Sequence, residues 1–108
     1  MRVFIYAYED TYKGLHGIYD VRVVDVSSLE EANEYGMVMS GDVIESYGIA
    51  DENFDEDEYE AAFSEACMWD IYPIDEKKAK GLSIEELDKL ASDWGKDLFI
   101  KKYCGEMF

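Results

Sequence analysis

The chain is short of positive charge, histidine, cysteine and proline, and each shortage narrows what the protein can be. Its 108 residues hold 10 Lys and Arg against 26 Asp and Glu, with 1 His, 2 Cys and 1 Pro. Two isolated thiols, Cys67 and Cys104, do not make the disulfide framework of a small secreted protein, so we expect two core residues in a cytoplasmic protein. No apolar run reaches the ~18 residues of a membrane span. The early acids Glu9 and Asp10 argue against a signal peptide.

Positive charge is missing above all from the middle of the chain. Residues 25–74 hold fifteen carboxylates and no Lys or Arg, whereas residues 1–24 are balanced and residues 75–108 hold seven Lys against eight acids. The middle segment therefore carries nearly the whole net charge of −16. Charge that is segregated in this way creates a directional field, which favours a role in steering or docking a partner.

The hydrophobic pattern predicts one α+β domain over residues 1–108. Residues 3–8 and 18–26 indicate two strands of a hairpin. Serines at 27 and 28 with glutamates three residues later predict the start of a helix that runs to about residue 47, with an apolar stripe of Ala32, Gly36, Met39, Val43 and Tyr47. A second helix is expected over about 59–66, a strand over 68–74 that ends at Pro73 or forms an edge, a helix after Ser83, and a last short helix after Gly95. The order is β-β-α-α-β-α-α. The simplest packing is a small, mainly antiparallel three-stranded sheet with helices packed on one face.

The motifs of catalysis and of cofactor binding fail when they are tested residue by residue. Asp51, Asn53, Asp55 and Asp57 alternate like calcium ligands, but the sixth and twelfth positions of this stretch hold Glu and Ala instead of Gly and Glu. His16 is the only histidine and has no nucleophile with a visible reason to lie beside it. We therefore predict no enzyme, no catalytic residue, no metal site and no cofactor. Loose binding of divalent cations by the carboxylates stays open as an alternative.

The sign of the charge also argues against direct binding of DNA or RNA, because phosphate contacts require Lys or Arg and the C-terminal lysines are matched by neighbouring acids. It favours instead a partner with a basic surface. Carboxylates three or four residues apart on a helix lie roughly 5–6 Å apart, close enough to imitate the phosphates of a nucleic acid. The candidate partner-binding residues are Asp42, Glu45, Asp51, Glu52, Asp55, Glu56, Asp57, Glu58, Tyr59, Glu60 and Glu65.

Three stretches resemble a known family. The opening YAYEDTYKGLHGIYDV, the acidic middle with DEYE, and SIEELDKL are similar to ArdA-type antirestriction proteins of plasmids and phages. That resemblance implies a start of strand, Tyr/Gly-containing loop and second strand, and an acidic surface that imitates DNA. The profile also resembles small acidic anti-CRISPR proteins. The chain departs from ArdA proteins in being shorter and in ending with a lysine-rich helix, so no interface residue is carried over.

These observations lead to a hypothesis and an alternative. The hypothesis is a non-enzymatic inhibitor, encoded by a mobile element, that acts in the bacterial cytoplasm. It would occupy the basic nucleic-acid-binding groove of a host defence protein, such as the CRISPR effector Cas9 or a restriction complex, without touching nucleic acid or membrane itself. A homodimer is compatible with so small a domain. The alternative is a housekeeping interaction domain whose acids serve only solubility and whose contacts use an apolar sheet face.

Overall fold

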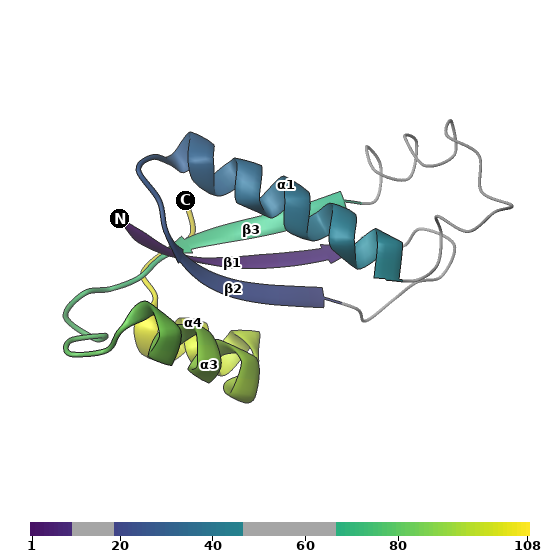
Figure 1. Ribbon diagram of the computed structural model, residues 1–108. Coiled ribbons are helices and arrows are strands. Elements are labelled where there is room, and N and C mark those ends of the chain that lie inside the picture. Colours follow the sequence, from purple (N-terminus) through teal and green to yellow (C-terminus); the bar gives the residue numbers. More distant parts are fainter. Residues whose placement is uncertain (10–18, 47–66) are drawn as a thin grey trace, which may run out of the picture.

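The computed structural model describes residues 1–9, 19–46 and 67–108, which are organised around a three-stranded antiparallel sheet. Strands β1 (Arg2–Glu9), β2 (Tyr19–Asp25) and β3 (Cys67–Pro73) lie in the order β2-β1-β3 (Figure 1). Helices α1 (Leu29–Ser46), α3 (Ile84–Trp94) and α4 (Lys96–Tyr103) complete the described elements. The predicted α+β class and antiparallel sheet are confirmed. The helix expected over 59–66 lies outside the described residues.

The central strand β1 is apolar on both of its faces. Val3, Phe4 and Ile5 are all fully buried, although successive residues of a strand point to opposite sides of the sheet. Val3 and Ile5 pack in one cluster with Met39 of α1, and Phe4 packs in a second cluster with Phe99 of α4. Helices therefore cover both faces: α1 lies on one face, and α3 with α4 lies on the other (Figure 1).

This arrangement corrects the expectation that all helices pack on one face. An antiparallel strand with one solvated face alternates apolar and polar residues, whereas an uninterrupted apolar run indicates burial on both sides. The run Val3–Phe4–Ile5 in β1 has this second pattern. The second cluster is aromatic: the ring centroids of Phe4 and Phe99 lie 4.8 Å apart, and those of Phe99 and Tyr103 lie 5.3 Å apart.

Helix α3 begins and ends as its sequence predicts. The Ser83 hydroxyl accepts a hydrogen bond from the backbone N–H of Glu86, and the Glu86 carboxylate accepts one from the Ser83 N–H. This reciprocal capping box satisfies two amides that a helix start otherwise leaves unpaired. Gly95, at φ 81°, separates α3 from α4 in a left-handed conformation that favours glycine. Among the described residues, no helix is both long and apolar enough to cross a membrane.

Each outer strand has main-chain groups that are already hydrogen-bonded on its outer side. Beside β3, the residues that follow α4 run along the edge: the N–H of Gly105 donates to the Pro73 carbonyl at 2.9 Å, and the N–H of Phe108 donates to the Ile71 carbonyl at 3.1 Å. Beside β2, the outward N–H of Val23 donates to the carboxylate of Asp88 on α3 at 2.9 Å. The prediction that Pro73 ends its strand or marks an edge is confirmed, since β3 ends at Pro73 and is an outer strand of the sheet.

Candidate functional site

The acidic helix α1 begins with a hydrogen-bonded cap. The Ser28 hydroxyl accepts from the backbone N–H of Glu31 at 3.2 Å, and the Glu31 carboxylate accepts from the N–H and the hydroxyl of Ser27. The prediction of two parallel capping boxes is thus half right, because Glu31 rather than Glu30 serves Ser27. These hydrogen bonds from Ser27 lower the pKa of Glu31, which keeps this carboxylate ionised.

One side of α1 is fitted closely to the sheet. The predicted apolar stripe is confirmed for Ala32, Gly36, Met39 and Val43, which are buried. Gly36 is required there, because a Cβ at this position would lie 2.3 Å from the Trp69 side chain of β3. A helix interior normally disfavours glycine, so close approach explains why one is present.

Two polar contacts fix the register of α1 on the sheet. The indole N–H of Trp69 donates to the side-chain oxygen of Asn33 at 2.9 Å. Further along, the Ser40 hydroxyl, which is 1% exposed, donates to the Met68 carbonyl at 3.0 Å. These two hydrogen bonds fix the rotation of α1 about its own axis. The same set of residues on its opposite side therefore faces outward.

That outward side combines carboxylates with exposed apolar side chains. Glu30, Glu34 and Asp42 are exposed, and between them lie Tyr35 and Val38, with exposed fractions of 38% and 60%. Helix α1 contains no Lys or Arg. Glu30 lies in the first turn, where a carboxylate favours the helix macrodipole, whereas Glu34 and Asp42 lie outside that turn and gain nothing from it. Helix stability therefore accounts for Glu30 but not for Glu34 or Asp42.

A shallow groove runs between α1 and β2. It is lined by a set of mainly polar and acidic residues: Arg22, Ser28, Glu30, Glu31, Glu34, Tyr35, Val38 and Met39. In the described part of the chain only two ion pairs form, one between the N-terminal amino group and Asp25 and one between Arg2 and Glu76. Arg22 is the one cation among the described lining residues and forms no ion pair with the groove carboxylates, so their charge can attract a cation from outside.

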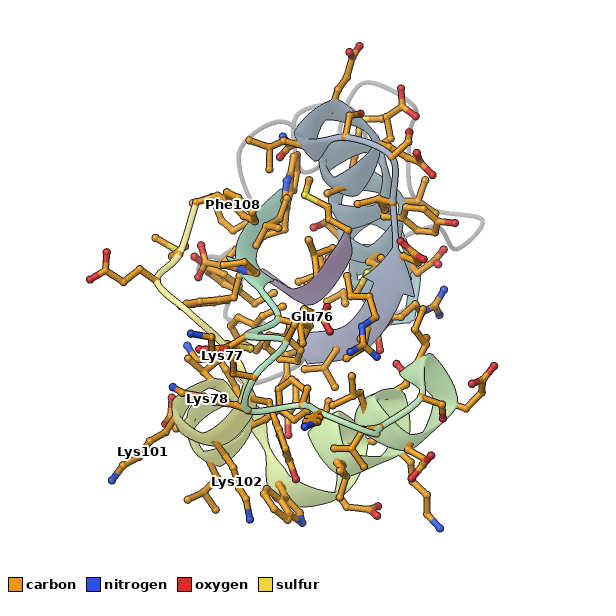
Figure 2. The ribbon with its side chains drawn as sticks, turned by 90° about the vertical axis from the view of Figure 1, so that its left-hand side faces the viewer. Glu76, Lys77, Lys78, Lys101, Lys102 and Phe108 are labelled. Carbon is orange, nitrogen blue, oxygen red and sulfur yellow. The ribbon has the colours of Figure 1, made fainter. Side chains whose placement is uncertain are left out.

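The C-terminal lysines differ from the expectation that neighbouring acids match them. Asp75 accepts hydrogen bonds from the backbone N–H groups of Lys77 and Lys78, and Glu76 turns away to pair with Arg2. Lysines 77, 78, 101 and 102 form no ion pair within the described residues and lie along one flank of the molecule, over α4 and the turn after β3 (Figure 2). A segment that is nearly neutral in sequence thus presents a cationic strip.

The predicted partner-binding residues fall mostly beyond what the structure describes. Asp42 is exposed on α1, and Glu45 belongs to the same helix. The remaining nine lie within residues 47–66, outside the described residues: Asp51, Glu52, Asp55, Glu56, Asp57, Glu58, Tyr59, Glu60 and Glu65. Sequence reasoning missed Glu34, Tyr35 and Val38, although the absence of Lys and Arg from this helix was a visible signal.

Catalytic or metal chemistry finds little support in the described residues. They contain no group of three His, Cys, Asp or Glu side chains that could hold a metal ion. Cys104 is buried, as predicted, and burial raises the pKa of its thiol to about 12, which suppresses the reactive thiolate. His16 and the alternating acids from Asp51 to Asp57 lie outside the described residues.

Comparison of the chain with protein-family models, with curated proteins and with solved structures finds no match in any of the three. Its function must therefore be argued from the chemistry of its own surface.

Proposed function

We propose that the protein is a non-enzymatic inhibitor that lays α1 on the basic nucleic-acid-binding surface of another protein and thereby excludes the nucleic acid. The supporting observation is the composition of the outward side of α1. Exposed Glu30, Glu34 and Asp42 alternate with exposed Tyr35 and Val38, and no cation of the described residues pairs with these carboxylates.

Each component of this surface has a separate task in the proposed mechanism. The carboxylates meet Lys and Arg side chains that otherwise hold phosphates, and opposite charge speeds the encounter. Electrostatics alone gives association rate more readily than affinity, so Tyr35 and Val38 supply the apolar area that slows dissociation. The acidic stretch from Asp51 to Glu60 extends the same negative field along the sequence. In keeping with the resemblance to antirestriction and anti-CRISPR proteins, the targets are a restriction complex or a CRISPR effector such as Cas9.

The test is a competition assay with a purified target nuclease and its labelled duplex. The wild-type protein should raise the apparent Kd of the nuclease for DNA, and the effect should weaken as salt rises from 0.05 M to ~0.5 M, because screening shortens the reach of exposed charges. The variant Glu30→Gln/Glu34→Gln/Asp42→Asn should lose at least about tenfold in inhibitory potency, which corresponds to ~1.4 kcal/mol.

Two further variants make this assay decisive. A matched control, Glu85→Gln/Asp97→Asn/Glu106→Gln, removes three exposed acids of the C-terminal part and should stay within about twofold of the wild type. A loop variant replaces Asp55, Glu56, Asp57 and Glu58 by Asn and Gln. If the loop variant loses inhibition while the α1 variant keeps it, α1 is not the docking surface. If inhibition survives both sets of substitutions, the acidic surface is not the inhibitory element.

One observation favours the alternative of an interaction domain that works through its sheet. On the face that carries α3 and α4, Tyr19 and Met68 remain 52% and 40% exposed. Tyr6 stacks on Tyr8 at 5.0 Å between ring centroids and lies 5.7 Å from the ring of Tyr19. Under this alternative, Tyr19→Glu/Met68→Glu should abolish partner binding, and salt should change the affinity little. The α1 variant should then bind like the wild type.

A further inference from the structure

The two most exposed large hydrophobic side chains of the described residues lie on different helices, one near carboxylates and the other near lysines. Val38 on α1 is 60% exposed, and Leu98 on α4 is 62% exposed. Val38 has Glu34 one helical turn before it and Asp42 one turn after it. Leu98 is followed after three and four residues by two lysines of the cationic strip. Val38 therefore has a carboxylate one turn away on either side, whereas Leu98 has two lysines on its C-terminal side and the carboxylate of Asp97 directly before it.

The surroundings of Leu98 form a groove that suits an acidic helix. Its lining consists of Asp93, Trp94, Leu98, Lys101 and Lys102. The Trp94 ring is 36% exposed and, with Leu98, supplies an apolar floor. The Lys102 ammonium lies 4.8 Å from the centroid of the Trp94 ring, and Lys101 has no ion pair within the described residues. A helix docks in such a groove through apolar residues spaced one turn apart, with its charges at the rim.

The helix with the matching pattern belongs to the chain itself. We propose that α1 of one copy docks in the α3–α4 groove of a second copy, with Val38 against Leu98 and with Glu34 and Asp42 against Lys101 and Lys102. Within one molecule the contact cannot form, because α1 and α4 cover opposite faces of the sheet (Figure 1). A contact between two different surfaces is heterologous, so it builds rings or open chains rather than a closed twofold dimer.

This self-association does not depend on the proposed inhibitory function, although it uses the same side of α1. Each copy carries a net charge of −16, and the mutual repulsion limits the affinity. We therefore expect a weak, reversible equilibrium that becomes visible at high protein concentration. A copy whose α1 is occupied by a neighbour could not present that helix to another protein, so self-association and partner binding would compete.

The experiment is sedimentation of the purified protein over a concentration series up to ~1 mM, the range of weak contacts. In ~0.15 M salt, the weight-average mass of the wild type should rise with concentration. Lys101→Glu/Lys102→Glu should abolish this rise, and so should Glu34→Lys/Asp42→Lys. An equimolar mixture of these two variants should associate again. The lysines introduced on α1 of the second variant then face the glutamates introduced on α4 of the first. The native acids on α1 of the first variant face the native lysines on α4 of the second.

A matched control separates the groove from general charge. Lys77→Glu/Lys78→Glu changes the net charge by the same amount on the same flank, outside the groove, and should associate like the wild type to within about twofold. Circular dichroism should show that all variants fold. A wild type that stays monomeric over the whole series overturns the proposal. It is equally overturned if Lys101→Glu/Lys102→Glu associates as the wild type does, or if the mixed variants stay monomeric.

Discussion

The helices on the two faces of the sheet differ in the charge that they expose and in the residues that they bury. On one face, α1 buries an apolar stripe, including a glycine in close contact with an indole ring, and turns carboxylates outward, with no Lys or Arg in the helix itself. On the other face, α3 and α4 close over an aromatic cluster and expose lysines among acids. The distinguishing feature of the α1 side is its exposed negative charge, and that of the α3–α4 side is its buried aromatic cluster. Substitutions should therefore reveal a fold held mainly from the α3–α4 side and a docking chemistry held mainly by α1.

The strongest test of this contrast is Phe99→Ala. Phe99 is fully buried and its ring lies against Phe4 and Tyr103, so its removal should lower the free energy of unfolding by about 3–5 kcal/mol. Urea denaturation followed by circular dichroism measures the change. Exposed Leu98, the preceding residue, is the control: Leu98→Ala should cost less than ~1 kcal/mol. Equal losses for the two variants would contradict the packing role assigned to this side.

On the α1 side, the next largest effect in this series should come from Gly36→Ala. The new methyl group would collide with Trp69, and overpacking of this kind costs about 1–3 kcal/mol, despite the better helix propensity of alanine. Denaturation of the single and double variants checks the cause. In the background of Trp69→Ala the same Gly36→Ala substitution should cost nothing or should stabilise. Additive effects of the two substitutions would show that the indole is not the obstacle.

Removal of a helix cap should have a smaller effect, of similar size on both sides of the sheet. Ser83→Ala deletes the acceptor for the Glu86 N–H, and Ser28→Ala deletes the acceptor for the Glu31 N–H. Each should lower the free energy of unfolding by about 1 kcal/mol. Thermal denaturation of the pair, with Ser92→Ala as an exposed serine control, measures it. A loss at Ser83 but none at Ser28 would mean that the Glu31–Ser27 contacts alone hold the start of α1.

The smallest effect should appear on acidification. The side-chain hydrogen bond from Arg2 lowers the pKa of Glu76, so this carboxylate stabilises the fold above its unfolded pKa and loses that contribution as pH falls through its folded pKa. Glu76 is largely exposed, and its contribution should be below ~1 kcal/mol. Glu76→Gln should be less stable than the wild type at pH 7, and the difference should shrink as pH falls and vanish once Glu76 is protonated in the folded state. A difference that persists in acid would assign the loss to packing instead of charge.

Local sequence signals predicted most of the described elements, because each depends on a few neighbouring residues. Ser83 with Glu86 and Gly95 marked the limits of α3, and Pro73 marked the end of an edge strand. The distribution of helices over the two faces was missed, although the apolar run Val3–Phe4–Ile5 was a visible signal that both faces are buried. Which helix covers which face depends on contacts such as that between Phe4 and Phe99, almost a hundred residues apart in sequence. The absence of ion pairs at the C-terminal lysines was missed for the same reason, because Glu76 pairs with Arg2, which lies at the other end of the chain.

The prediction of the candidate site was limited differently. The charge imbalance of residues 25–74 was visible in the sequence, and it led to Asp42 on α1. Which other residues of α1 face outward depends on its rotation, which Trp69 and Asn33 fix from elements that are distant along the chain. Sequence periodicity identified the buried stripe of α1, but exposed Tyr35 and Val38 could not be distinguished from core residues by their type.

The hydrogen bonds that flank the sheet also determine how the protein can aggregate. With the Val23 N–H held by Asp88, and the Ile71 and Pro73 carbonyls held by residues after α4, an incoming strand finds main-chain positions on both outer strands already taken. Larger particles of this protein should consequently consist of intact folded units joined by their side chains. Such particles should redissolve on dilution or with added salt, and should give no amyloid-type dye signal.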